Sequence, residues 1–267
     1  MSHYFKKQLK IGIGWIVILV IIVAGVYFLF FRSSAPTCFD GIKNQNEEGV
    51  DCGGVCASCV PEQMLEVLLQ VIIPTLNNNY DLVAKIENPN SDVGAEVIDY
   101  QFNLYDDTNQ IVSSKTGKTY ILPQETKYVV EPKFYSEKSA TKIEFKINNI
   151  SWKKLGQISD LELQVKNTEY QILEDGSNVL VGAIENRSSY DLDTIEVAGV
   201  LFDEDNEIIA VGKTSMNTVL RNETRGFEIF WPYPITQQVK SFDAKAYTNV
   251  FLNDNFIKAH GNPERIE

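Results

Sequence analysis

Apolar and polar positions alternate along much of the chain with a period of two, the pattern of half-buried β-strands. Between residues 98 and 104, four apolar side chains alternate with three polar ones: Ile98, Tyr100, Phe102 and Leu104 with Asp99, Gln101 and Asn103. A turn-forming run at 106–109 leads into a second apolar pair at 111–112, which predicts a hairpin. Many short strands separated by turns predict an all-β fold of antiparallel sandwiches.

The chain also repeats itself. The segment LVAKIEN at 82–88 returns as LVGAIEN at 180–186, LYDDTNQIV at 104–112 as LFDEDNEII at 201–209, and ILPQET at 121–126 as VLRNET at 219–224. The offsets are 98, 97 and 98 residues, the size of an independent domain rather than of a solenoid repeat. We therefore predict one sandwich in residues 62–154, a second in residues 155–255, and a flexible tail at 256–267.

One segment departs from strand alternation. Residues 11–31, IGIGWIVILVIIVAGVYFLFF, are 21 consecutive positions without a charge. As a helix they would span ~31 Å, close to the ~30 Å hydrocarbon core of a bilayer. Within this run from Ile11 to Phe31, Trp15 and Tyr27 lie toward the two ends, where aromatic rings favour the membrane interface. The run is too long for the apolar region of a cleaved signal peptide, so it predicts a transmembrane helix.

The charges beside this span predict its orientation. Lys6, Lys7 and Lys10 precede it, whereas only Arg32 closely follows it. The positive-inside rule then predicts a cytoplasmic tail at residues 1–10 and an extracytoplasmic body, with the lipid bilayer as partner of the single-pass span. After Arg32 the chain holds all 36 acidic residues and 20 of the 24 basic ones, a charge of −16 that argues against nucleic-acid binding.

All four cysteines lie in the juxtamembrane segment 32–61, at Cys38, Cys52, Cys56 and Cys59. Thiols oxidise outside the cytoplasm, so four closely spaced cysteines predict two disulfides. Three pairings are possible, and the sequence does not choose among them. A zinc ion held by four thiolates and a redox role for the last two cysteines are the alternatives.

The same segment is rich in oxygen-bearing side chains. Calcium favours several oxygen ligands on a bending backbone, and this loop offers them at Asp40, Asn44, Asn46, Glu48 and Asp51. Their spacing is not that of an EF-hand loop. Aspartate, asparagine and glycine also form turns without any ion. The sequence therefore predicts no cofactor for this loop and leaves calcium open, beside a purely structural role for these residues.

The spacing C-x-D-G-x-x-N-x-x-E-x-x-x-D-C-G-G-x-C-x-x-C in residues 38–59 resembles a short cysteine-rich module of surface and secreted proteins, many of them microbial. Glu47 takes the acidic position of this pattern. The resemblance implies export and disulfide bonding, and it brings no established activity.

Residues 102–106 read Phe-Asn-Leu-Tyr-Asp, which is similar to the signature of the FxLYD domain family. The surroundings also match, with Glu-Asn at 87–88 and Leu-Pro-Gln-Glu-Thr at 122–126. The second copy resembles the family through Leu-Phe-Asp at 201–203 and departs from it at Gly199, where the first Phe should stand. The resemblance implies immunoglobulin-like β-sandwiches of mostly unassigned role, often attached to membrane anchors, with no catalytic residues.

Enzyme chemistry finds little support in this sequence. The two histidines, His3 and His260, fall in the cytoplasmic tail and the C-terminal tail, outside the predicted domains. The sequence therefore predicts a membrane-anchored, extracytoplasmic, non-enzymatic protein that binds a protein partner or supports an envelope assembly, its molecular task unknown. A calcium-dependent ligand-binding surface protein and an exported hydrolase are the alternatives.

Overall fold

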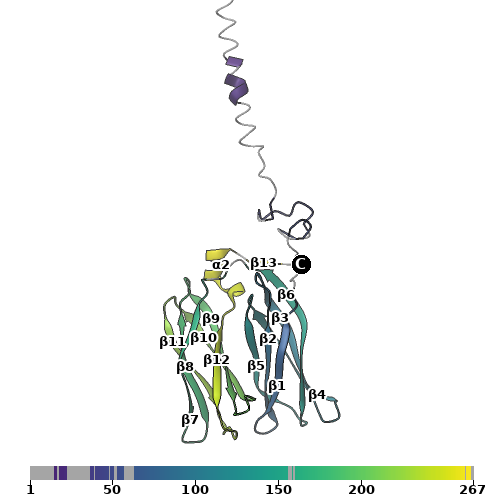
Figure 1. Cartoon of the computed structure of the whole chain (residues 1–267), viewed down its shortest axis with the longest axis vertical. Helices are drawn as coiled ribbons and strands as arrows, with labels where there is room; N and C mark the ends of the chain where they lie inside the picture. The colour runs from purple at the N-terminus through teal and green to yellow at the C-terminus, as the bar shows by residue number, and fades with distance from the viewer. Residues whose placement is uncertain are drawn as a thin grey trace, which may run out of the picture. The chain divides into compact units, whose positions relative to one another are not determined.

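A computed structural model of the chain describes residues 15–16, 18–22, 37–38, 40–47, 49–50, 53–56, 63–155, 158, 160–261 and 263–265. The chain divides into two compact units, Met1–Ala57 and Ser58–Glu267. The second unit contains all of the strands described below, and Figure 1 shows them as two neighbouring groups.

The N-terminal unit contains the predicted membrane span. Residues 15–16 and 18–22 are helical, and the Trp15 side chain is exposed. In the part of the chain that the structure describes, no helix has both the length and the apolar character needed to cross a bilayer. Ile11, Tyr27 and Phe31 lie outside the described residues, so the anchor at 11–31 stays a prediction.

The first copy of the repeat forms six strands that build two facing sheets. They are β1 (Glu66–Pro74), β2 (Asn79–Glu87), β3 (Val93–Tyr105), β4 (Ile111–Ile121), β5 (Thr126–Tyr135) and β6 (Lys142–Lys154). One sheet has the order β1-β2-β5 and the other contains β6-β3-β4, with antiparallel neighbours throughout. Phe102 and Leu104 are fully buried in the core between these sheets, as their alternation with polar residues predicts.

The second copy repeats this topology strand for strand. Its strands are β7 (Leu163–Ile172), β8 (Asn178–Asn186), β9 (Leu192–Phe202), β10 (Ile208–Val219), β11 (Thr224–Trp231) and β12 (Ser241–Tyr247). The sheets are β7-β8-β11 and β10-β9-β12, the same strand order as in the first copy. All of their strand pairs are antiparallel, so the predicted all-β, antiparallel, sandwich-like architecture is confirmed.

In its described residues, 250–261 and 263–265, the C-terminal segment departs from the flexible tail expected at 256–267. It forms the short helices η1 (Val250–Leu252) and α2 (Asp254–His260) and the strand β13 (Glu264–Arg265), which pairs with β6 of the first copy. The side chain of Asn253 caps α2 by accepting a hydrogen bond from the Phe256 amide at 2.8 Å, and Phe256 is 2% exposed. The sequence pattern missed this helix because seven residues are too few to show a helical period.

The two copies share a buried core, which the expectation of two independent domains did not include. Outward-facing residues of β2 and β5, Val83 and Val130, join a single cluster with Val200 of β9 and Val211 of β10. All four are less than 5% exposed. Figure 1 shows the β1-β2-β5 sheet of the first copy beside the β10-β9-β12 sheet of the second. We call this contact the seam; its core is one that neither copy forms alone.

Phe251, in the helix η1, packs against both copies at one end of the seam. Its ring packs so closely on β3 of the first copy that a Cβ atom added to Gly94 would lie 2.7 Å from it. Leu122 of the first copy and Leu155, which directly follows β6, join the same buried cluster as Phe251. The C-terminal segment therefore stabilises the pairing of the two copies as well as the second copy itself.

Candidate functional site

The repeated asparagines of the two copies have a structural role. Asn88 and Asn186 are both fully buried. The Nδ2 of Asn88 donates to the carbonyl oxygens of Val93 at 2.7 Å and Leu122 at 2.9 Å, and Asn186 makes the equivalent pair of hydrogen bonds in the second copy. The repeated Glu-Asn is thus a structural requirement of the turn, because unpaired backbone carbonyls are costly in a core.

The acidic hairpin tips are also turn residues. In the first copy, Oδ1 of Asp106 accepts hydrogen bonds from the backbone amides of Thr108 and Gln110, both at 2.9 Å. Asp203 accepts the same pattern from its own loop in the second copy. Hydrogen bonding from the loop lowers the pKa of Asp106, first through the Thr108 hydroxyl. These carboxylates act as the acceptors that close the hairpins.

The departure of the second copy at Gly199 has a packing reason. A Cβ atom at this position would lie 2.8 Å from Cδ1 of Ile229 and 3.7 Å from the ring of Trp231. Trp231 is 2% exposed and its Nε1 donates to the Val211 carbonyl at 2.9 Å. The second copy therefore fills its core with a tryptophan from β11, which leaves no room for an aromatic side chain at 199.

The cysteine segment contains one described disulfide, between Cys38 and Cys56, with an S–S distance of 2.03 Å. The prediction of disulfide bonding is confirmed for this pair, and the structure supplies a pairing that spacing did not. Cys52 and Cys59 lie outside the described residues. Glu47 lies beside this pair, but sulfur atoms in a disulfide carry no thiolate for a metal ion.

The predicted calcium ligands are brought together only in part. The carboxylate of Asp40 accepts hydrogen bonds from the amides of Thr37 and Ile42 and from Nδ2 of Asn44, at 3.0–3.2 Å. These contacts lower the pKa of Asp40, the Thr37 amide contributing most. Asn44 meets Asp40 through its amide nitrogen, which does not bind cations, and Asn46 is exposed. The contacts are those of a turn.

Glu48 and Asp51 of the calcium set lie outside the described residues. The calcium alternative therefore rests on the sequence, without a converging group of oxygen ligands among the residues that the structure describes.

A histidine, a serine and an aspartate meet near the C-terminal helix, which sequence reasoning did not foresee. Nε2 of His260 lies 3.0 Å from Oδ2 of Asp160, and the Ser189 hydroxyl donates to the same oxygen at 2.8 Å. A hydrolytic triad places the histidine between the serine and the carboxylate. Here the carboxylate lies between them, so His260 is not placed to take the proton of Ser189.

A bulge in β5 creates the most distinctive site of the second unit. The register shifts so that Pro132 and Lys133 together oppose Asp81 of β2. Lys133 has a φ of 58°, a left-handed conformation that a lysine rarely adopts, and its amide donates to Oδ1 of Asp81 at 2.8 Å. Bulges and strained residues of this kind concentrate at functional sites, because the surrounding structure must hold them.

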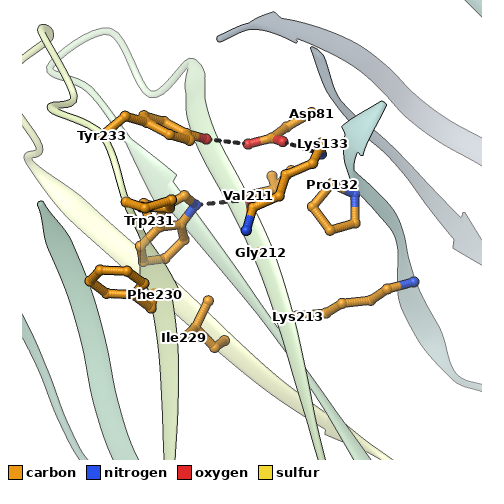
Figure 2. Close-up of a pocket in the computed structure, with 11 residues that line it drawn as sticks. Asp81, Pro132, Lys133, Val211, Gly212, Lys213, Ile229, Phe230, Trp231 and Tyr233 are labelled. Carbon is orange, nitrogen blue, oxygen red and sulfur yellow. Dashed lines mark hydrogen bonds between the residues drawn. The ribbon is translucent and has the colours of Figure 1, made fainter. Parts of the chain in front are cut away.

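Asp81 also connects the two copies. Its side chain belongs to the first copy and is 1% exposed, and its Oδ2 accepts a hydrogen bond of 2.5 Å from the Tyr233 hydroxyl of the second copy. Figure 2 shows both hydrogen bonds of this carboxylate. Burial raises the pKa of Asp81 above its ordinary value of 3.8, and the hydrogen bond from Tyr233 opposes that rise.

These residues border a cavity of about 120 Å³, which we call the seam pocket. Its wall from the second copy consists of apolar side chains and the backbone of β10: Val211, Gly212, Ile229, Phe230, Trp231 and Pro232. Pro132, Lys133 and Lys213 complete it, and Figure 2 shows the Lys133 side chain extending from beside Asp81 toward Gly212. A Cβ at Gly212 would lie 2.5 Å from Ile229, so only glycine permits this packing.

A buried lysine lies elsewhere in the seam. Lys127 is 1% exposed, and its ammonium rests 3.3 Å from the ring centre of Tyr120 and 4.8 Å from that of Tyr247 in the second copy. Among the described residues, its Nζ has no hydrogen-bond partner. Burial lowers the pKa of Lys127, while the negative charge of Glu125 opposes the shift. The rings attract the cation through their faces.

Comparisons with known proteins add little to this picture. No family model and no curated protein matches the chain. Among solved structures, the crystal structure of red sea bream transglutaminase aligns with 10% identity and a TM-score of 0.21, over 69% of this chain. The chain spans only 29% of the length of that transglutaminase, and a likeness this low supports no conclusion about activity.

Proposed function

We propose that this chain is a single-pass membrane protein whose two immunoglobulin-like sandwiches, of the FxLYD type, form an extracytoplasmic, non-enzymatic binding platform. The uncharged run at 11–31 and the lysines before it support the anchor and its orientation. The disulfide between Cys38 and Cys56 supports an oxidising compartment. The Phe-Asn-Leu-Tyr-Asp of 102–106 supports the family.

The observation that carries the binding role is the seam. Two tandem domains joined by a linker move independently, and a partner that contacts both must then restrict that motion. Here Val130 and Val200 belong to one buried core, and Asp81 is hydrogen-bonded to Tyr233 across the seam. The two copies therefore present a preorganised surface, in which the seam pocket is formed by both of them.

The location is tested with the full chain, tagged at its C-terminus and produced in its own host. Protease added to intact cells should remove the tag, and alkaline extraction should leave the chain in the membrane pellet. A control variant without residues 11–31 should become soluble. A tag that survives in intact cells, or a wild-type chain in the soluble fraction, would contradict the proposal.

The binding role needs a separate measurement. The full chain, crosslinked in intact cells and purified from detergent-solubilised membranes, should retain a defined partner that is lost when residues 63–265 are deleted. The deletion variant keeps the predicted anchor and the cysteine segment, so it serves as the matched control. Recovery of the same proteins with both chains would assign the contact to the anchor region instead.

A further inference from the structure

We propose that the seam pocket binds a carboxylate carried on a short aliphatic stem, either a small acid or an acidic side chain of a partner protein. This inference rests on the proposed binding function and names the chemistry that the platform recognises. It follows from three properties of the pocket: the hydrogen-bonding groups that it offers, the apolar walls, and its size.

The hydrogen-bonding groups of the pocket favour an acceptor as ligand. Both carboxylate oxygens of Asp81 already accept hydrogen bonds, from the Lys133 amide and from the Tyr233 hydroxyl. Lys213 extends toward Glu131, with 3.6 Å between Nζ and Oε1. Within the residues that the structure describes, no carboxylate lies within ion-pair distance of the Lys133 ammonium, although its positive charge lowers the pKa of the nearby Asp81. An ammonium has three donors and no acceptor, so it selects an anion.

The fold holds this lysine in place. Lys133 sits in the bulge of β5 with a left-handed backbone, and the hydrogen bond from its amide to Asp81 keeps that conformation. Its side chain therefore begins at the rim of the pocket and extends toward Gly212 of the second copy (Figure 2). A strained residue maintained at a cavity between two repeats points to a ligand rather than to packing alone.

The walls and the volume define the rest of the ligand. Ile229, Trp231 and Pro132 present apolar surface, which favours methylene groups over further charge. A cavity of about 150 Å³ accommodates a six-carbon ring in a known case. The 120 Å³ of the seam pocket therefore fits roughly five or six non-hydrogen atoms. Butyrate and the side chain of glutamate both have this size and chemistry.

The test titrates the full chain in detergent micelles by calorimetry with butyrate, with N-acetylglutamate α-amide and with n-butylamine. Because a ligand of this size makes few contacts, we expect the carboxylates to bind with a Kd of about 1 mM, at one site per chain. Tighter binding of the glutamate derivative would assign the site to a partner's side chain, and tighter binding of butyrate to a free acid. Equal binding of n-butylamine would overturn the proposal.

Variants distinguish binding in the seam pocket from a general attraction of anions to surface lysines. Lys133→Met should weaken butyrate binding at least tenfold, and Lys133→Arg should restore most of it, because the charge returns. Lys118→Met is the matched control: this lysine is 73% exposed on β4, pairs with Asp99, and should leave binding unchanged. Thermal melts of each variant establish that it is folded.

Unchanged butyrate binding in a folded Lys133→Met variant would refute the proposal, as would the absence of saturable binding by the wild type at about 10 mM, tenfold above the expected Kd. The protease, extraction and crosslinking experiments do not involve the pocket. A failure of this inference is therefore distinguishable from a failure of the proposed function.

Discussion

Tyr233→Phe tests whether the two copies are held together by the buried carboxylate of Asp81. The change removes one hydroxyl and leaves the ring in place, so the hydrogen bond of 2.5 Å across the seam is lost without a large cavity. Asp81 is 1% exposed, so bulk water does not readily replace the lost donor. The variant therefore leaves a buried carboxylate with one hydrogen bond, from the Lys133 amide.

The magnitude follows from the charge of the acceptor. A hydrogen bond to a charged group contributes about 1.5–3 kcal/mol, and the lower end applies because Tyr233 is half-buried. For a body of this size each kcal/mol shifts the Tm by about 2–4 °C. We expect the Tm at pH 8 to fall by roughly 3–6 °C.

The pH dependence gives the sharper result. Burial raises the pKa of Asp81 above 3.8, so its contribution to stability is complete below that pH and is lost as the pH rises through the raised pKa. Tyr233 lowers the pKa of Asp81, which means that its hydroxyl stabilises the ionised form. The loss caused by Tyr233→Phe should therefore be largest at pH 8 and shrink toward pH 4.

The assay is thermal unfolding of the full chain, followed by far-ultraviolet circular dichroism at pH 8, 6 and 4. Tyr135→Phe is the control, because Tyr135 is 57% exposed at the end of β5 and should give no shift. An equal Tm loss at all three pH values would show that the hydroxyl does not stabilise an ionised Asp81, and no loss would refute the hydrogen bond across the seam.

Three further predictions address the seam and the cysteine segment. Lys127→Met should raise the Tm by about 2–4 °C, because methionine fills the same space without a buried ammonium that lacks a hydrogen-bond partner; a lower Tm would mean that the two tyrosine rings and the negative charge of Glu125 compensate its burial fully. Phe251→Ala should destabilise the body by about 3–5 kcal/mol, and hydrogen exchange should accelerate in both copies; acceleration in the second copy alone would contradict the shared core. Calcium at millimolar concentration should leave the Tm of the full chain unchanged, because hydrogen bonds from the protein already occupy the Asp40 carboxylate; a rise of several degrees would restore the calcium alternative.

The sequence by itself determined the all-β, antiparallel character of the body and its duplication. Strand alternation depends only on which side chains point to the same face, and turn chemistry depends on a few adjacent residues. Ile98 to Leu104 therefore predicted β3 correctly, and the turn-forming run at 106–109 predicted the hairpin that the Asp106 side chain closes. The repeat offset also predicted that the second copy would follow the topology of the first.

Only the tertiary structure decided which outer faces are buried. Equivalent positions of the two copies differ there: the half-buried Gln101 on the outer face of β3 corresponds to Ala198 on β9, which lies buried in the seam. The sequence does carry this signal, because residues 195–202 read IEVAGVLF, a nearly continuous apolar run typical of a strand that is buried on both faces. The signal does not say which surface covers the strand.

The seam pocket and the buried Lys127 lay beyond sequence reasoning altogether. Asp81 and Tyr233 are 152 residues apart, and nothing in the composition of either segment links them. The ammonium of Lys127 meets Tyr247 only because β5 of one copy packs beside β12 of the other. The local sequence pattern indicates which face of a strand is buried within its own sandwich. The burial of its outer face, the pKa values of its side chains and the cavities beside it depend on which distant part of the chain packs against it.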